Sequence, residues 1–394
     1  MPWPRLYASS PDATKIVASG EQRISADSHM TEPSTVWEER LPAAFRGQDI
    51  GLPKRNRGKR PNDRDGGWDP DARLKDMAIG GVSAEVLYPT TAIHLWRQGD
   101  VPLEEAAIRA YNDWLIEFCN AAPQRLWGLA MISLWDIDHA VAELERCRNA
   151  GLRGAVVWPE PPTDLPFSLP HYDRFWAAAE SLRMPVNMHI SGGAPGLPRE
   201  EQGSPEDSAN DVTIERVYRG LEHPARATKI LADLVRADVF QRHPDLRIVT
   251  AELGVGWLPY CAQELDYYFS SHREHTGTAQ SERLPSEQVY EQVYATFIVD
   301  PVGASMLPRY GRDTFMWSND YPHAASTWPH DDVVIAHLLG HLSAEDRAAV
   351  LRDNVARLYN EGELPPLADP PGAHEDLAGW YETHQPIQTI SAGA

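Results

Sequence analysis

Residues 23–29 have the sequence RISADSH, in which a short apolar run passes directly into Asp27-Ser28-His29. The run predicts the first strand of the fold, and residues two apart on a strand, such as Asp27 and His29, point to the same face. Two further residues with metal-binding side chains, His189 and Asp320, end strand-like runs far downstream. A barrel of parallel strands brings all strand ends to one rim, so these distant groups can converge there on one metal ion.

Short runs rich in Val, Ile, Leu and Tyr alternate along the chain with longer stretches of helical period, which is typical of parallel βα units. Eight strands are predicted, as a closed barrel requires: Arg23–Ala26, Ala84–Tyr88, Leu126–Met131, Gly154–Trp158, Pro185–His189, Arg247–Ala251, Ala295–Val299 and Thr314–Trp317. Helices are predicted over Asp71–Ile79, Leu103–Ala121, Ile137–Ala150, Tyr172–Leu182, Ala225–Phe240, Gly256–Ser271, Asp331–Leu339 and Ala344–Tyr359, and Val302–Tyr310 is ambiguous. The fold class that follows is α/β, a TIM (β/α)8 barrel.

The length of 394 residues, 42% of them apolar, allows one large domain with a full core. We expect a single barrel domain over residues 21–362, an N-terminal tail over 1–20 and a Pro-rich, irregular C-terminal tail over 363–394. Residues 41–70 are rich in Pro, Gly, Arg and Lys without a sustained period, which predicts a long insertion after the first strand. A second long loop is expected over residues 191–208.

The composition excludes several kinds of partner. The formal net charge of −21 would repel nucleic acid and anionic membranes, because affinity for them comes mostly from neutralised phosphate. No run approaches the roughly 18 apolar residues of a membrane span, and residues 1–20 lack the apolar core of a signal peptide. The three cysteines show no spacing typical of a disulfide framework or a metal knuckle. We therefore expect a soluble protein of the reducing cytoplasm.

Each candidate ligand taken alone is ambiguous. Asp27 alone would more often be a helix cap, His189 a hydrogen-bonded structural residue, and Asp320 the cap of a loop. Together with His29, however, they supply two nitrogens and two oxygens from the first, fifth and eighth strands, with a position left for water or substrate. The combination predicts one divalent metal ion.

Several motifs, in order along most of the chain, resemble the branch of the amidohydrolase superfamily that contains aminocarboxymuconate-semialdehyde decarboxylase and γ-resorcylate decarboxylase. They are residues 27–33 (DSHMTEP), His189, residues 252–259 (ELGVGWLP), residues 318–323 (SNDYPH) and residues 354–359 (NVARLY). The resemblance implies a distorted TIM barrel with one divalent ion, zinc or manganese, and either nonoxidative decarboxylation or hydrolysis. It also implies that Asp27, His29, His189 and Asp320 are the ligands, and we expect zinc, with manganese as the alternative.

Glu252 departs from the family pattern, because the related decarboxylases carry a histidine at the end of the sixth strand. A carboxyl group in an apolar pocket can act as a general acid or base. Glu252 can also serve as a further metal ligand, or as an acceptor for backbone amides of the adjacent Gly-rich loop. The sequence leaves these three roles open.

Other polar and aromatic residues follow the predicted strands. We expect His323 to act in catalysis with Asp320 and Glu252, the alternative for His323 being a hydrogen bond within its loop. The predicted substrate contacts are Glu32, Tyr88, Trp158 and Glu160. For Glu32 the alternative is to orient a ligand, and for the two aromatic residues it is to fill the core.

We favour a metal-dependent decarboxylase acting on a small aromatic or unsaturated carboxylic acid. A proton from Asp320 or Glu252 would then go to the substrate carbon as carbon dioxide leaves. A hydrolase of an amide, ester or lactone uses the same ligands and is the alternative, and a non-catalytic metal-binding barrel is a third hypothesis. The partner is expected to be a small molecule, and the insertion at 41–70 and the tail favour a homodimer.

Overall fold

The computed structural model describes residues 21–52, 64–189, 195, 209–272, 283–323 and 325–367. The predicted N-terminal tail, residues 53–63 of the insertion and residues 368–394 of the C-terminal tail lie outside the described residues. The predicted loop over 191–208 lies outside them too, apart from Pro195.

Eight parallel strands form one sheet in the order β1 to β8, each paired with the next along the chain. Beyond β8 the sheet meets β1 again, because the N–H of Asp320 donates to the carbonyl of Asp27 (3.1 Å) and that of His29 to the carbonyl of Tyr321 (2.6 Å). The strands are β1 Arg23–His29, β2 Val82–Tyr88, β3 Leu126–Met131, β4 Gly154–Val157, β5 Val186–His189, β6 Ile248–Ala251, β7 Val293–Phe297 and β8 Phe315–Trp317. The eight predicted strands and the TIM barrel are thereby confirmed.

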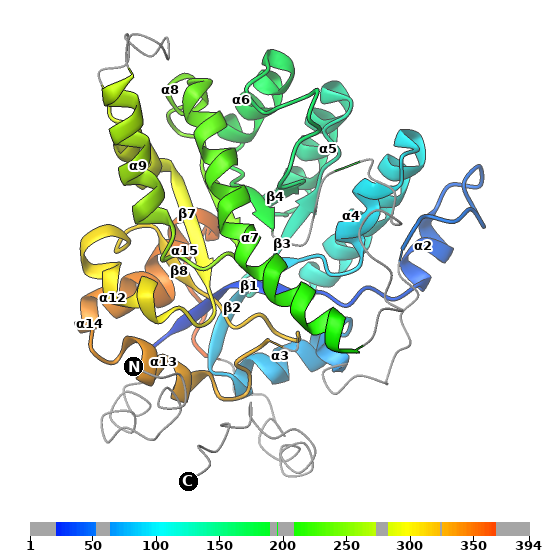
Figure 1. Ribbon diagram of the computed structural model, residues 1–394. Coiled ribbons are helices and arrows are strands. Elements are labelled where there is room, and N and C mark those ends of the chain that lie inside the picture. The colour runs from blue at the N-terminus through cyan, green and yellow to red at the C-terminus, as the bar shows by residue number, and fades with distance from the viewer. Residues whose placement is uncertain are drawn as a thin grey trace.

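Helices surround the strands on the outside (Figure 1). They are α2 Thr35–Arg40, α3 Pro70–Ile79, α4 Val101–Asn120, α5 Ile137–Asn149, α6 Asp173–Ser181, α7 Ala209–Arg236, α8 Val239–Arg242, α9 Leu258–Ser271, α11 Pro285–Gln292, α12 Pro301–Tyr310, α13 Asp331–Leu339, α14 Ala344–Ala348 and α15 Asn354–Tyr359. Asp69, Asp100, Asp136 and Asp300 begin α3, α4, α5 and α12, and each side chain accepts a backbone N–H of the first turn. The caps at Asp136 and Asp300 place the starts of α5 and α12 shortly after the ends of β3 and β7.

Several predicted boundaries were wrong. The helix expected over Ala225–Phe240 is two helices, and the first begins at Ala209 because Pro224 lies inside α7 rather than before it. The helix expected over Ala344–Tyr359 is α14 and α15, with a π-helical turn between them. The ambiguous segment near Val302 is helix α12, and no local pattern indicated α2 or α11.

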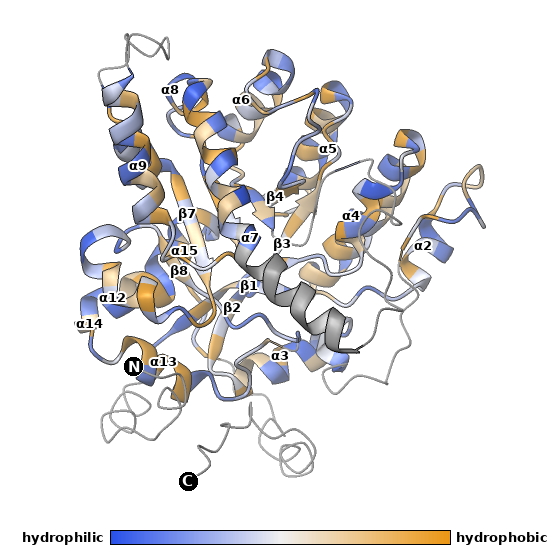
Figure 2. Ribbon diagram, viewed as in Figure 1, coloured by the Kyte–Doolittle hydropathy of each residue, from blue (hydrophilic) through white to orange (hydrophobic). Residues whose placement is uncertain are grey.

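The core lies between the strands and the inner faces of the helices. All seven residues of β2 are buried, and Figure 2 shows mainly apolar strands among helices that carry one apolar and one polar side. Inside the barrel the hydroxyls of Tyr88 and Tyr359 both donate to Asn187 Oδ1, over 2.6 and 2.7 Å. No helix in the described part of the chain is both long and apolar enough to cross a membrane.

Candidate metal centre

Strand β1 supplies the first two predicted ligands. The strand does not end at Ala26 as expected but continues through His29, with an extra residue between Ser25 and Ser28 relative to β2. Such bulges redirect side chains at barrel rims. Asp27 and His29 are both buried, and Asp27 Oδ1 lies 3.3 Å from His29 Nε2.

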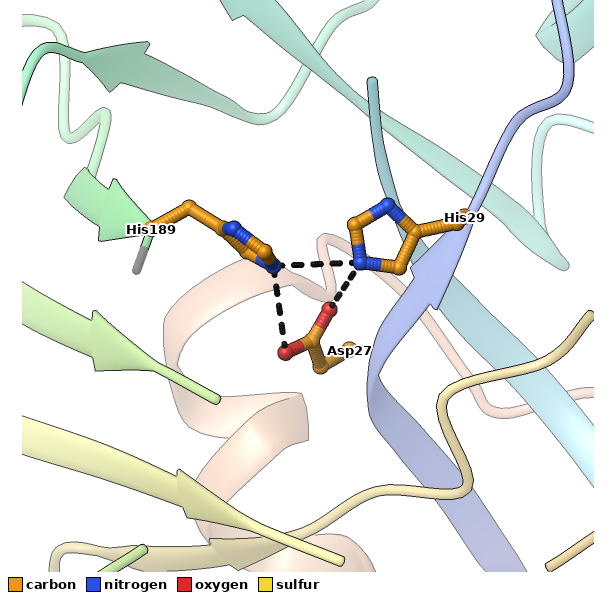
Figure 3. A group of neighbouring side chains, drawn as sticks. All are labelled: Asp27, His29 and His189. Atoms are coloured by element: carbon orange, nitrogen blue, oxygen red, sulfur yellow. Dashed lines mark hydrogen bonds and ion pairs between the residues drawn. The ribbon is translucent and has the colours of Figure 1, made fainter. Parts of the chain in front are cut away.

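His189, the last residue of β5, completes a compact group with these two. Its Nε2 lies 3.1 Å from His29 Nε2 and 3.9 Å from Asp27 Oδ2. Figure 3 shows the three side chains turned toward one another from β1 and β5. The structure thus brings these residues, which are far apart in the sequence, together at one rim of the barrel.

The tautomer of His29 follows from its other ring nitrogen. His29 Nδ1 lies 3.1 Å from the carbonyl oxygen of Pro89, which can only accept, so Nδ1 of the neutral ring carries the proton. Nε2 of His29 then presents a lone pair to Asp27 Oδ1 and to His189. Electron-rich atoms this close together are stabilised by a cation between them.

Asp320, three residues beyond β8, joins the same group. Its Oδ1 lies 3.5 Å from His29 Nε2 and 2.8 Å from His323 Nδ1. The backbone of Asp320 is left-handed (φ 53°), which costs a residue with a side chain about 1–3 kcal/mol and persists where the surroundings impose it. All four predicted ligands thus lie together at one end of the barrel.

The carboxylates of this group are short of hydrogen-bond donors. Asp27 Oδ1 and both carboxylate oxygens of Asp320 are buried and accept no hydrogen bond of regular geometry from any residue that the structure describes, although Asp320 Oδ1 faces His323 Nδ1. Burial raises the pKa of Asp27, which His189 partly offsets, and burial followed by repulsion from Asp27 raises the pKa of Asp320. A buried pair of carboxylates next to two imidazoles fits a divalent cation well.

Glu252 also faces the group, from just beyond β6. Its Oε2 lies 3.3 Å from His189 Nε2, its side chain is 23% exposed, and its backbone is left-handed (φ 60°). Burial, followed by repulsion from Asp320 and Asp27, raises the pKa of Glu252 well above its ordinary value. The N–H of Glu252 donates to Thr296 Oγ1 (2.9 Å), whose hydroxyl also lies 3.4 Å from Asp27 Oδ2.

One of the three roles left open for Glu252 is taken by another residue. In the Gly-rich loop, the N–H groups of Val255 and Gly256 donate to Asp300 Oδ2 over 2.7 and 2.8 Å. Asp300 is therefore the acceptor for this loop, and it also caps α12. The roles of acid or base and of metal ligand remain for Glu252.

His323 and Glu32 belong to one connected arrangement. The ring of His323 stacks on that of His29 with centroids 4.0 Å apart, and its Nε2 lies 3.0 Å from Thr90 Oγ1. Glu32 accepts the backbone N–H groups of Thr90, Thr91 and Ala92 over 2.8 to 3.3 Å. These contacts show Glu32 holding the loop that contacts His323, and the role of Glu32 toward substrate or ligand stays a prediction.

The other three predicted substrate contacts make their hydrogen bonds, ring contacts or ion pairs with residues outside the group of candidate ligands, apart from the ring of Tyr88 near His189. Tyr88 is wholly buried, with its ring 5.3 Å from that of His189 and its hydroxyl directed to Asn187. Trp158 is buried against Trp135, with ring centroids 5.1 Å apart, as the core-filling alternative has it. Glu160 pairs with Arg226 of α7 (2.9 Å) and lines a small hollow beside β5 and β6. As substrate contacts, Glu160, Tyr88 and Trp158 stay predictions.

Sequence reasoning missed the residues that hold the ligands. Thr90 follows the second predicted strand and Thr296 lies within the seventh, so strand position was the only signal available for them. Arg73 on α3 is wholly buried, pairs with Glu85 (2.5 Å) and donates to the carbonyl of His29 (2.8 Å). Nothing in the sequence distinguishes Arg73 from a surface arginine.

Comparison with known proteins supplies independent information. A family model described as amidohydrolase matches residues 24–360. γ-Resorcylate decarboxylase from Rhizobium radiobacter is 28% identical over 320 residues, which cover 73% of this chain and 86% of that protein.

Solved structures with the same barrel include an amidohydrolase from Mycobacterium avium subsp. paratuberculosis K-10, with a TM-score of 0.66 and 19% identity over 86% of this chain and 99% of that one. Another is a dihydroxybenzoic acid decarboxylase from Polaromonas sp. JS666 with bound manganese and the inhibitor 2-nitroresorcinol. Its TM-score is 0.59 and its identity 20%, over 86% of this chain and 96% of that one.

Proposed function

Because this chain belongs to the amidohydrolase family, and is therefore a metal-dependent lyase or hydrolase, we propose that it is a nonoxidative decarboxylase of a small hydroxylated aromatic carboxylic acid. The observation that carries this proposal is the buried group of two carboxylates and two imidazoles, in which Asp27 Oδ1 and both carboxylate oxygens of Asp320 have no hydrogen bond of regular geometry from the described residues. The similarity to γ-resorcylate decarboxylase, which covers 73% of this chain, supports the same proposal. Asp27, His29, His189 and Asp320 would hold the ion.

When bound, a divalent ion supplies positive charge that binds the substrate carboxylate and stabilises negative charge developing on the reacting ring. The protein contributes the remaining steps. Asp27 and Asp320 fix the position of that charge, and the stacked ring of His323 borders the site beside Asp320. The Thr90 loop, held by Glu32, keeps His323 in this position.

Glu252 is the proposed proton donor. It is the one carboxylate of the described group with an exposed fraction above zero, and it lies beside His189. Its proton would pass to the ring carbon that carries the carboxylate. The carbon–carbon bond then breaks, its electron pair returns to the ring, and carbon dioxide leaves. Glu252, left as a carboxylate, takes a new proton from water.

Hydrolysis is the alternative, and the carboxylate at position 252 favours it, because the related decarboxylases carry a histidine there. A carboxylate can remove a proton from an attacking water as readily as it can deliver one. The same ligands serve both reactions, so the substrate decides between them.

We also propose zinc as the resident ion, since two imidazoles and two carboxylates suit it, with manganese as the alternative because a structural neighbour holds that ion. Cys119, Cys147 and Cys261 are buried and unpaired, which supports a cytoplasmic setting. The homodimer stays a proposal. Light scattering that gave a mass near the 44.0 kDa of one chain would reject it.

The test is turnover by metal-loaded protein on two panels of substrates. Release of carbon dioxide from 2,6-dihydroxybenzoate and related hydroxybenzoates supports the decarboxylase. Release of an acid with an amine or alcohol, without carbon dioxide, supports the hydrolase instead. Metal binding without turnover on either panel would leave the non-catalytic barrel as the best account.

A further inference from the structure

Tyr321 connects two of the proposed ligands through its main chain. It follows Asp320 directly, and its carbonyl accepts the N–H of His29 over 2.6 Å. The residue is 1% exposed, so its side chain is surrounded by protein. A displacement of Tyr321 would therefore move Asp320 and His29 relative to each other.

The side chain of Tyr321 is held by a partly buried ion pair between Arg64 and Asp76. Its hydroxyl donates to Asp76 Oδ2, and the same carboxylate accepts Nε (2.9 Å) and Nη2 (2.6 Å) of Arg64. Asp76 is 3% exposed. The indole of Trp328 lies against the ring of Tyr321, with centroids 5.4 Å apart, and donates to the carbonyl of Asp76 over 2.7 Å.

A buried ion pair also lies against the ring of Tyr321. The guanidinium of Arg73 lies 4.6 Å from the centre of the Tyr321 ring and pairs with Glu85. Arg73 also donates to the carbonyl of His29, whose N–H is bound to Tyr321. Both main-chain groups of His29 are thus fixed by residues of this assembly.

We propose that Tyr321, Asp76 and Arg64 form a positioning relay that sets the affinity of the metal centre without touching the ion. The inference rests on the metal dependence proposed above. Arg64 belongs to the insertion after β1, so this insertion acts on the ligands through the relay. Groups that orient metal ligands in this way change metal affinity about 10-fold to 100-fold when they are removed.

The test is titration of metal-free protein with Mn²⁺ by calorimetry, for wild type, Tyr321→Phe and a control. The control is Tyr172→Phe, which removes the hydroxyl of another buried tyrosine, one that donates to the carbonyl of Leu165 (2.7 Å) outside the metal centre. We expect Tyr321→Phe to weaken Mn²⁺ binding at least 10-fold and to broaden the electron paramagnetic resonance lines of bound Mn²⁺, and Tyr172→Phe to leave both unchanged.

A second variant disturbs the Tyr321 hydroxyl by adding a methyl group next to it. A Cβ at Gly66 would lie 2.5 Å from the hydroxyl oxygen of Tyr321 and 2.9 Å from Asp76 Oδ2, so Gly66→Ala must push the relay aside. It should also weaken Mn²⁺ binding, and it serves if Tyr321→Phe does not fold. Wild-type affinity in the folded variants overturns the relay alone, whereas a wild type that binds neither Mn²⁺ nor Zn²⁺ overturns the proposed metal dependence and the relay with it.

Discussion

Glu104 is predicted to make the stability of this protein fall as the pH rises from 4.5 to about 7. The residue lies on α4, is wholly buried, and neither of its carboxyl oxygens has a hydrogen-bond partner of normal geometry in the described part of the chain. Burial raises its pKa from the ordinary 4.5 to about 7, against a smaller lowering by Ser133 and Trp135. The folded protein therefore holds this proton more tightly than the unfolded chain does.

The sign and size of the effect follow from this difference. Below pH 4.5 the carboxyl group of Glu104 is protonated in both the folded and the unfolded state, so the group does not lower the free energy of unfolding there. Between pH 4.5 and about 7 only the unfolded chain releases the proton, and the free energy of unfolding falls by about 1.4 kcal/mol per pH unit. Above that range the loss is complete, at about 3 kcal/mol.

The assay is urea denaturation of wild type and Glu104→Gln at pH 4.5 and pH 8. The variant cannot titrate, so its stability relative to wild type should improve by about 3 kcal/mol between the two pH values, whatever the amide itself costs. Glu145→Gln, at an exposed position on α5, is the matched control and should show no such change. An equal difference between Glu104→Gln and wild type at both pH values would refute the reasoning.

Two other predictions concern Glu252 at the candidate metal centre and the buried ion pair of Arg73 with Glu85. Glu252→Gln keeps the shape of the proposed proton donor but cannot donate the proton, so it should lower kcat about 10²-fold or more. Carbon dioxide release measures kcat, and metal analysis should show unchanged metal content. An unchanged kcat would remove Glu252 from the chemistry. Arg73→Met leaves Glu85 buried without its partner and should lower the free energy of unfolding by about 3–5 kcal/mol. Arg174→Met, at an exposed pair with Asp138, should cost under about 1 kcal/mol, and a similar loss in both would contradict this view of burial.

The strands and the convergence of the four candidate ligands were predictable because both depend on local pattern. A buried parallel strand is a continuous apolar run, and a polar residue at the end of such a run lies at the rim of a barrel. Asp27, His29, His189 and Asp320 all follow this rule, and the structure brings them together. The family resemblance added the order of the motifs.

Side-chain direction was not predictable in the same way. Glu32 and Tyr88 lie near the rim in sequence, but one turns to three backbone N–H groups and the other to Asn187 inside the barrel. Those hydrogen-bond partners come from other strands and loops, so no local sequence pattern predicts them. The contacts among Arg64, Asp76 and Tyr321 were unpredictable for the same reason, although Tyr321 lies within one of the family motifs.

The central claim is that two acidic and two imidazole side chains hold one catalytic ion. The most direct measurement is the metal content and turnover of His189→Ala beside wild type, with circular dichroism to verify the fold. The account predicts that the variant keeps the spectrum of the wild type, loses its bound divalent ion and loses activity together with it. A folded His189→Ala protein that retains one equivalent of metal and full turnover would contradict it.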